Sequence, residues 1–351
     1  MAWLRTGSVV EINEEGGERL KHSTPNKLKL LLMLALAAAA LFLIYQGGRW
    51  LEERSAKPEP RGDYQARNAQ EITTTYENVD YRQRKSLTSI LVLGIDHSET
   101  QAEGRTSGGQ ADFLQLLVMD DSAKKIARLQ IDRDTMTPIT VLGVLGNRSG
   151  MRTSQISLSH GFGDGGEQSC ELTVEAVSNL LLGVPVDYYL ALNLDGISVL
   201  NDLAGGVTVT LTDDFSSLDA SMTSGKTLTL QGQQAEFYVR SRRNIGIGTN
   251  EARMERQERY VNQLLVQIDE LQQKEQDYAG KLYDALTPYL TTNLSRGRLI
   301  NLAWTARDYT RLNPMQLEGE HRVGSDGFTQ FYADDHALME TVLELFYEKM
   351  K

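Results

Sequence analysis

The chain of 351 residues has one cysteine, Cys170, and five histidines. A single cysteine excludes both an intramolecular disulfide and a cysteine-based metal centre. Cys170 falls at helical spacing with Val174 and Val177, which predicts a thiol packed in a core. The histidines show no metal-ligand spacing, so we interpret them as structural or exposed. His97 is singled out only because it follows Asp96.

Motifs of nucleotide binding and acyl transfer are also absent. The segment from Gly104 to Gly109 is rich in glycine but has neither the lysine nor the spacing of a P-loop, and no Gly-x-Ser-x-Gly elbow occurs. Lysine and arginine total 36 against 47 aspartate and glutamate residues, a net charge of −11. Because the chain also lacks a basic arm and a helix-turn-helix pattern, we expect no nucleic-acid partner and set aside a transcriptional regulator.

One hydrophobic run is long enough to concern a membrane. Leu30–Tyr45 runs sixteen residues without a charge, the short end of a transmembrane span and longer than the core of most signal peptides. We predict a disordered cytoplasmic tail over residues 1–29, a single uncleaved transmembrane helix over 30–46 and an extracytoplasmic stalk over 47–85. Basic residues lie on both sides of the run, so charge alone barely decides its orientation. The tail is placed inside and the stalk outside mainly because of the family resemblance given below.

From Leu87 onward, short hydrophobic runs alternate with helical patterns. The expected strands cover residues 90–95, 113–119, 126–131, 139–145, 187–194 and 207–211. The expected helices cover residues 167–182, 197–203 and 231–239, and another begins with Thr249 or Asn250 as its cap. This alternation predicts an α/β layered domain with a central mixed β-sheet flanked by helices. We place it at residues 86–275 and expect 276–351 to be a helical extension packed on it.

The stretch from Tyr238 to Gln257 concentrates cations in an acidic chain: Arg240, Arg242, Arg243, Arg253 and Arg256. At 100° per residue, Arg253 and Arg256 share the face of Leu264 and Ile268, which goes inward. Arg253 also lies near a helix N-terminus, where the dipole disfavours a cation. A bound phosphate would relieve both problems, so we predict an anion site here. The alternative is a turn whose arginines pair with nearby carboxylates. Other charged residues of this helix are expected to face solvent: Glu255, Glu258 and Arg259.

Acids and arginines also collect where the expected strands end. Asp96 and Asp112 could share a hard cation such as Mg²⁺ through oxygen ligands. Four arginines could hold a diphosphate: Arg133, Arg240, Arg242 and Arg253. Together these residues describe metal-assisted phosphoryl transfer, in which the protein positions phosphate groups and stabilises charge. Taken alone, Asp96 could equally cap a turn, and Arg133 could form a local salt bridge with Asp134.

The same segments resemble a known family, the LytR-CpsA-Psr proteins of bacterial envelopes. The matching stretches are Ile90-Leu-Val-Leu-Gly-Ile-Asp96, Ala111-Asp112, Asp132-Arg-Asp-Thr135, Val184-Pro-Val-Asp-Tyr-Tyr189, Tyr238-Val-Arg-Ser-Arg242 and Arg253-Met-Glu-Arg-Gln257. Each motif is weak alone, but together they cover about residues 87–272 in the order of the family.

The resemblance implies a membrane-anchored, extracytoplasmic domain. Such a domain transfers a polyprenyl-pyrophosphate-linked anionic glycopolymer, of teichoic acid or capsule type, to a hydroxyl of peptidoglycan with magnesium. It implies metal or pyrophosphate contacts for Asp96 and Asp112, which we assign to the metal. It implies pyrophosphate-binding and catalytic roles for a further set: Arg133, Arg240, Arg242, Arg253 and Gln257. The alternative is an envelope protein that binds polyprenyl phosphates without catalysis.

The chain departs from the family pattern at three positions. Gln110 stands where the family usually has an arginine, and Asn250 stands where it usually has an aspartate. A lysine common near Gln155 is missing as well. The first two departures favour the non-catalytic alternative slightly.

Overall fold

The structure is a computed structural model, and it describes residues 72–96, 108–143, 146–242 and 244–350. Among these residues, no helix is both long enough and apolar enough to cross a bilayer. The predicted tail (1–29) and the predicted transmembrane helix (30–46) lie outside the described residues, as does His97.

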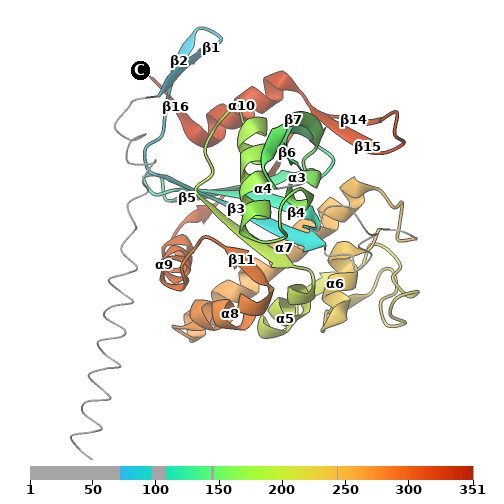
Figure 1. The fold of residues 1–351 in the computed structure, drawn as a ribbon. Coiled ribbons are helices and arrows are strands. Elements are labelled where there is room, and N and C mark those ends of the chain that lie inside the picture. The colour runs from blue at the N-terminus through green and yellow to red at the C-terminus, as the bar shows by residue number, and fades with distance from the viewer. Residues whose placement is uncertain (1–71, 97–107, 144–145, 243, 351) are drawn as a thin grey trace, which may run out of the picture. The chain divides into compact units, whose positions relative to one another are not determined.

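A mixed β-sheet forms the centre of the fold (Figure 1). The strand order is β11-β8-β3-β4-β5-β12, and β13 also pairs with β5. β3, β4 and β5 are antiparallel neighbours, whereas β8 is parallel to β3, and both β12 and β13 are parallel to β5. The strands are β3 (Leu87–Asp96), β4 (Gln110–Asp120), β5 (Lys125–Ile131), β8 (Tyr188–Asn193), β11 (Leu290–Thr292), β12 (Thr310–Arg311) and β13 (Met315–Gln316). The predicted central mixed sheet is thereby confirmed.

Helices and small hairpins surround this sheet. The helices are α3 (Leu158–Gly161), α4 (Glu167–Leu180), α5 (Asp195–Leu203), α6 (Gln233–Arg240), α7 (Asn250–Lys274), α8 (Tyr278–Leu286), the 3-10 helix η1 (Thr287–Tyr289), α9 (Arg296–Arg307) and α10 (Asp335–Phe346). The remaining strands are β1 (Thr73–Tyr76), β2 (Val79–Gln83), β6 (Met136–Leu142), β7 (Arg148–Gln155), β9 (Thr208–Thr210), β10 (Thr227–Thr229), β14 (Gly319–Val323), β15 (Thr329–Ala333) and β16 (Tyr347–Lys349).

Successive side chains of the central strands point to opposite faces of the sheet. Leu91 and Leu93 join the largest hydrophobic core, which α4 and α10 cover. Cys170 of α4 is buried in this core, and burial raises its pKa to about 12, so the predicted core thiol is confirmed. Ile90 and Val92 point to the other face, toward α5, α7, α8 and α9. The sheet is therefore the middle layer between two sets of helices.

A separate hydrophobic cluster holds α6 and α7 together. It joins these two helices to the β9–β10 hairpin and the loop that follows β9, through Phe215, Tyr238, Tyr260 and Leu264. Thr249 caps α7, since its side-chain oxygen accepts from the Ala252 amide at 3.3 Å. The α6–α7 turn is therefore held by packing on one side and a helix cap on the other.

Three expectations from the sequence need correction. Residues 276–351 contain α8, α9 and α10, but they also supply β11, β12 and β13 to the central sheet, so they are not a helical extension. Residues 72–85 of the predicted stalk include the β1–β2 hairpin, which pairs with β16 near the C-terminus. The expected strand at 207–211 is present as β9, but it does not join the central sheet; it pairs with β10 in a separate two-stranded sheet.

Candidate functional site

An irregularity in the sheet places Asp112. β3 and β4 pair residue by residue, but the register shifts between Gly94, opposite Phe113, and Ile95, opposite Ala111. Asp112 is therefore the extra residue of a β-bulge, a distortion that re-aims a side chain. Its side chain is 13% exposed, so the carboxylate is partly shielded from water.

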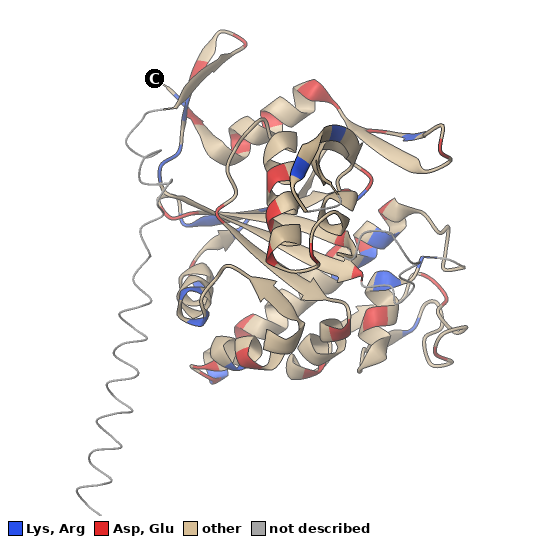
Figure 2. Ribbon diagram, in the orientation of Figure 1, with Lys and Arg blue, Asp and Glu red and all other residues tan. Residues whose placement is uncertain are grey.

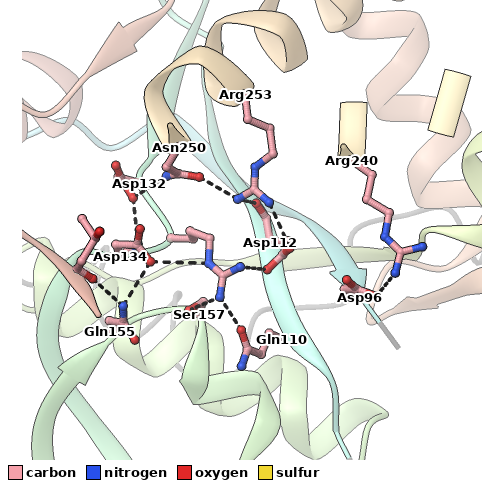
Figure 3. Close-up of polar contacts among 12 residues, drawn as sticks. Asp96, Gln110, Asp112, Asp132, Asp134, Gln155, Ser157, Arg240, Asn250 and Arg253 are labelled. Atoms are coloured by element: carbon pink, nitrogen blue, oxygen red, sulfur yellow. Dashed lines mark hydrogen bonds and ion pairs between the residues drawn. The ribbon is translucent and has the colours of Figure 1, made fainter. Parts of the chain in front are cut away.

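Two arginines from different elements hold this carboxylate (Figure 3). Arg133, in the turn after β5, has its Nη1 2.5 Å from Asp112 Oδ1. Arg253, near the beginning of α7, has its Nη1 3.1 Å from Asp112 Oδ2. Arg133 also donates to the side-chain oxygen of Gln110 and, at 3.5 Å, to Ser157 Oγ. The shared carboxylate thus fixes two guanidinium groups at one point.

Arg253 is 3% exposed, although it lies where the helix dipole disfavours a cation. Burial lowers the pKa of its guanidinium, while Asp112 acts in the opposite direction. Arg253 Nη2 donates to Asn250 Oδ1 at 2.7 Å, and Asn250 Nδ2 donates to Asp132 Oδ1 at 2.8 Å. An amide suits this position because it accepts from a guanidinium and donates to a carboxylate.

Asp132 is also contacted by a segment that is remote in the sequence. His321 of β14 has its Nε2 2.9 Å from Asp132 Oδ2 and its Nδ1 3.0 Å from Glu251 Oε1. Its ring lies 4.8 Å from the ring of Phe331. The β14–β15 hairpin is therefore joined to both the turn after β5 and the first turn of α7. Sequence reasoning missed this link, because the two contacting residues are 189 positions apart.

Asp134 lies behind Arg133 and is nearly enclosed, with 5% exposed. Arg133 Nε is 3.6 Å from its Oδ1, and Gln155 Nε2 donates to the same oxygen at 3.1 Å. Burial raises the pKa of Asp134, and the charge of Asp132 raises it further. The predicted Arg133–Asp134 salt bridge is thus present, but Arg133 is shared with Asp112. Gln155 contacts the site although the family's lysine is missing nearby.

Arg240, at the end of α6, forms a second pair. Its Nη2 is 2.9 Å from Oδ1 of Asp96, the last residue of β3, and its Nη1 is 2.9 Å from Glu236 Oε1. The Arg240 side chain is 42% exposed. The side chain of Arg242 has no hydrogen bond or ion pair to any residue that the structure describes, although its charge acts on Asp134. Arg242 is therefore available to an anionic ligand.

The next polar residues of α7 hold the end of α6. Gln257 Nε2 donates to a carbonyl oxygen of α6 at 3.2 Å. Arg256 donates to the carbonyl oxygens of Tyr238 and Ser241 and pairs with Asp213 at 3.0 Å. Its inward orientation was predicted correctly, but carbonyl groups and a carboxylate, rather than a bound anion, satisfy it. In Figure 2, basic residues (blue) mark the region of α6 and α7, while acidic residues (red) repeat along α4.

The cluster of charged residues around Asp112, Arg240 and Arg253, which we call the mouth, borders an apolar cavity of about 450 Å³. Asp112, Arg240, Arg253 and Gln257 line one end of it. Along β4, the seven steps from Asp112 to Met119 make its wall about 24 Å long. Its apolar lining comes from the second face of the sheet and from α7, α8 and α9: Ile90, Val92, Phe113, Leu117, Leu190, Leu192, Val261, Leu264, Leu282, Leu286, Leu299 and Leu302.

Asp96 and Asp112 are the oxygen donors that fit magnesium. Asp112 Oδ1 is buried and makes no hydrogen bond, but it is ion-paired with Arg133, so a metal ion would have to share it with this guanidinium. In the part of the chain that the structure describes, no cluster of three or more histidine, cysteine, aspartate or glutamate residues could hold a metal. A metal held by these two carboxylates would need further oxygen ligands from another source, such as phosphate groups.

An apolar cavity suits a hydrocarbon chain, whereas guanidinium groups at a helix N-terminus suit phosphate. The fold and site thus define a class, an α/β protein with an apolar cavity beside a cluster of arginines. Comparison with known proteins identifies it further. The chain belongs to the LytR_cpsA_psr family, whose model matches residues 58–346.

Similar proteins support the same assignment. Two relatives bear the name polyisoprenyl-teichoic acid–peptidoglycan teichoic acid transferase TagU. The protein from Halalkalibacterium halodurans is 28% identical over 233 residues, covering 66% of this chain and 69% of that protein. The protein from Enterococcus faecalis is 25% identical over 279 residues, covering 77% and 85%.

Solved structures show the same fold. Bacillus subtilis TagV has a TM-score of 0.57 and 22% identity over 74% of this chain and 97% of that one. TagT bound to LI-WTA has a TM-score of 0.56 and 24% identity, covering 74% and 90%.

Proposed function

We propose that this protein is a phosphotransferase that attaches a polyprenyl-pyrophosphate-linked anionic glycopolymer to peptidoglycan during cell-wall assembly. One observation carries the proposal: an arginine-lined mouth opens directly into an apolar cavity. A prenyl chain would occupy the cavity while its pyrophosphate stays among the arginines. The relatives named as teichoic acid transferases support a polymer of the teichoic acid type.

In the proposed reaction, one phosphorus–oxygen bond replaces another. An acceptor hydroxyl of peptidoglycan bonds to the phosphorus that carries the polymer, and its proton leaves to water. The bond from this phosphorus to the bridging oxygen breaks, and polyprenyl phosphate departs. Such reactions leave the protein mainly to position phosphates and to stabilise charge. Arg133 and Arg253, fixed by Asp112, would orient the pyrophosphate, and Arg240 and Arg242 would stabilise the departing phosphate.

Asp96 and Asp112 would hold a magnesium ion at the mouth. Bound there, magnesium would neutralise negative charge on the pyrophosphate. The chain's own contribution is to bring the two carboxylates to adjacent strand ends, where the bulge aims Asp112 and Arg240 holds Asp96.

We also place the protein in the cell membrane. Residues 30–46 would cross it once, with the N-terminus inside and the folded domain outside. This arrangement brings a membrane-borne lipid substrate and peptidoglycan to the same side.

The arginines provide the direct test. Arg240→Ala and Arg242→Ala should each weaken binding of farnesyl pyrophosphate by about 1.5–3 kcal/mol, the cost of losing a charge-assisted hydrogen bond. Arg259→Ala is the matched control, because Arg259 lies on α7 with a side chain 41% exposed. Its contacts are long ones, to Glu255 at 3.7 Å, Tyr238 Oη at 3.5 Å and Thr212 Oγ1 at 3.4 Å, and none of them is to the arginines or carboxylates of the mouth. Titration calorimetry measures all three. Equal effects from the three variants would show that the anion site lies elsewhere.

A protein that binds polyprenyl phosphates without transfer is the second candidate. Gln110 and Asn250 favour it, because they stand where the family usually has an arginine and an aspartate. Release of lipid phosphate from a prenyl-pyrophosphate-linked oligosaccharide, in the presence of peptidoglycan, separates the two candidates. Tight binding without any release would establish the second.

A further inference from the structure

One side of α7 makes a row of polar contacts with the sheet. Asn250, Met254, Glu258 and Asn262 recur every four residues along the helix and therefore form one stripe. We call this stripe, with its partners on the sheet, the polar seam. At its outer end Asn250 contacts Asp132, as described above. One turn further, Gln130 Nε2 donates to the Met254 carbonyl oxygen at 3.3 Å.

Arg128 of β5 lies at the centre of the polar seam. Its Nη2 is 3.0 Å from Glu258 Oε1 and 2.6 Å from Asn262 Oδ1. Glu258 Oε2 also accepts from Gln115 Nε2 at 3.1 Å. The side chains of Arg128 and Glu258 are only 5% and 13% exposed. About two turns beyond Asn262, at the end of the polar seam away from the mouth, Arg311 of β12 pairs with Asp269 at 2.7 Å. The polar seam thus runs the whole length of the cavity.

Arg128 also lines the cavity. Its Nε and Nη1 atoms are buried and make no hydrogen bond to any described residue. Its neighbour across the strands is Leu117, five steps along β4 from Asp112 and hence about 17 Å from the mouth. The next stripe of α7, which includes Val261 and Leu264, borders the cavity instead of packing on the sheet.

Two physical arguments show that this arrangement is not explained by stability. Replacing a buried ion pair with apolar side chains of similar volume is often neutral or stabilising. Protein interiors also close over empty space, because close packing is favourable. An apolar helix stripe above an apolar sheet should therefore settle onto it and fill the cavity. Arg128 and Glu258 have long side chains, and their contacts hold these side chains extended across the space between β5 and α7.

We propose that the Arg128–Glu258 pair is a spacer that holds α7 above the sheet and so sets the width of the cavity for a prenyl chain. This inference rests on the proposed function, in which the cavity receives that chain. Arg128 and Glu258 are then residues that determine specificity for the lipid tail, without contact with the pyrophosphate. The length of the two side chains sets the distance between α7 and the sheet. Their charges only keep the side chains paired with each other, so that they do not bend into the cavity.

The test compares two probes by titration calorimetry in the full-length protein with magnesium present. Inorganic pyrophosphate reports on the mouth alone, and geranylgeranyl pyrophosphate, whose chain is long enough to pass Arg128, reports on the mouth and the cavity. The ratio of the two affinities is the chain-dependent gain. The double variant Arg128→Ala/Glu258→Ala should bind inorganic pyrophosphate as the wild type does. Its chain-dependent gain should fall by about tenfold or more, because expelling two methylene groups of the chain already has that effect.

Two further variants complete the design. Glu255→Ala/Arg259→Ala removes a charge pair from the exposed side of the same helix and should change neither affinity. Arg128→Met/Glu258→Leu keeps long side chains without charge and should retain the gain to within about threefold while folding at least as stably. If the alanine pair fails to fold, Arg128→Ser/Glu258→Ser replaces it, because serine is also short but polar, with a loss expected in the same direction.

The outcomes separate the two proposals. The spacer would be overturned if the alanine pair kept the full chain-dependent gain of the wild type. It would also be overturned if the methionine–leucine pair lost this gain as completely as the alanine pair. A wild-type protein that binds both probes equally well would overturn the proposed function and the spacer together.

Discussion

Asp112 is shared by two arginines, and this sharing determines how the mouth responds to ligands. Arg133 and Arg253 approach its two oxygens separately, so the carboxylate already carries two cations when no ligand is bound. A magnesium ion near Asp112 must compete with both of them. A pyrophosphate removes that competition, because it gives the arginines other oxygens to contact.

Magnesium binding should therefore depend on the phosphate ligand. We expect weak binding of magnesium to the ligand-free protein and clearly tighter binding once farnesyl pyrophosphate is present, since binding of the two ligands is reciprocally linked. Calorimetric titration of magnesium with and without farnesyl pyrophosphate measures the difference, and Asp112→Asn, which removes one carboxylate ligand, should reduce it. Tight magnesium binding to the ligand-free protein, or no change on adding the pyrophosphate, would contradict this linkage.

Asp134 makes stability depend on pH. Its folded-state pKa is raised above its ordinary value of 3.8, first by burial and then by Asp132. Protonation of Asp134 therefore favours folding. The stability that the protonated carboxyl contributes is present in full below the unfolded-state pKa and is lost as the pH rises through the folded-state pKa. At neutral pH the ionised carboxylate lowers the free energy of unfolding. Asp134→Asn keeps a partner for Gln155 and removes the charge.

This variant should raise the melting temperature near pH 7.5 relative to wild type. The difference should shrink as the pH falls toward about 4, where the wild-type carboxyl becomes neutral. Thermal unfolding followed by circular dichroism at both pH values checks this. If the variant melts lower than wild type by the same amount at both values, the charge of Asp134 is not what disfavours folding.

At the scale of elements, α7 shows what helical periodicity reveals and what it misses. From the helical period we predicted that Arg253 and Arg256 face inward, and both are buried. The same period placed Glu258 in solvent, but Glu258 faces the sheet and pairs with buried Arg128. A hydrophobicity pattern assigns a charged residue to the outside, because it cannot register a partner that is 130 positions away. Polar seams between elements are therefore invisible to it.

The short strands were missed for a related reason. β12 and β13 have two residues each, and β14 is exposed along its whole length. Such strands show no alternation of apolar and polar side chains. β7 is also mostly exposed, and no strand was predicted over its residues. The long strands β3, β4 and β5 were predicted because buried runs of this length have few alternatives.

At the scale of the whole molecule, the mouth was predictable and the cavity was not. Motif resemblance identified Asp96, Asp112, Arg133, Arg240 and Arg253, and the structure gathers these residues around one opening. The cavity is made by β3, β4, β5 and β8 together with α7, α8 and α9. Its residues look like ordinary core positions in the sequence, because an apolar wall and an apolar core have the same composition. Only the assembled fold shows that space remains between them.

The orientation of the chain in the membrane is the last property at this scale, and charge does not decide it. Four basic residues precede the apolar run and four follow it, within the range that governs orientation: Arg19, Lys21, Lys27 and Lys29 before it, and Arg49, Arg54, Lys57 and Arg61 after it. The proposed substrates decide instead, since peptidoglycan lies outside the membrane.

We therefore expect the whole chain beyond Trp50 to be extracytoplasmic. Protease added to intact protoplasts should digest the folded domain, while a cytoplasmic marker protein in the same sample stays whole until lysis. Immunoblotting with an antibody against the C-terminal residues follows the loss. Because β16 pairs with β2, the C-terminal segment has its own protection against protease, so a second antibody against α4 follows digestion in another part of the domain. A domain that survives until the protoplasts are lysed would place it in the cytoplasm, away from its proposed acceptor, and the transferase assignment would fall with the orientation.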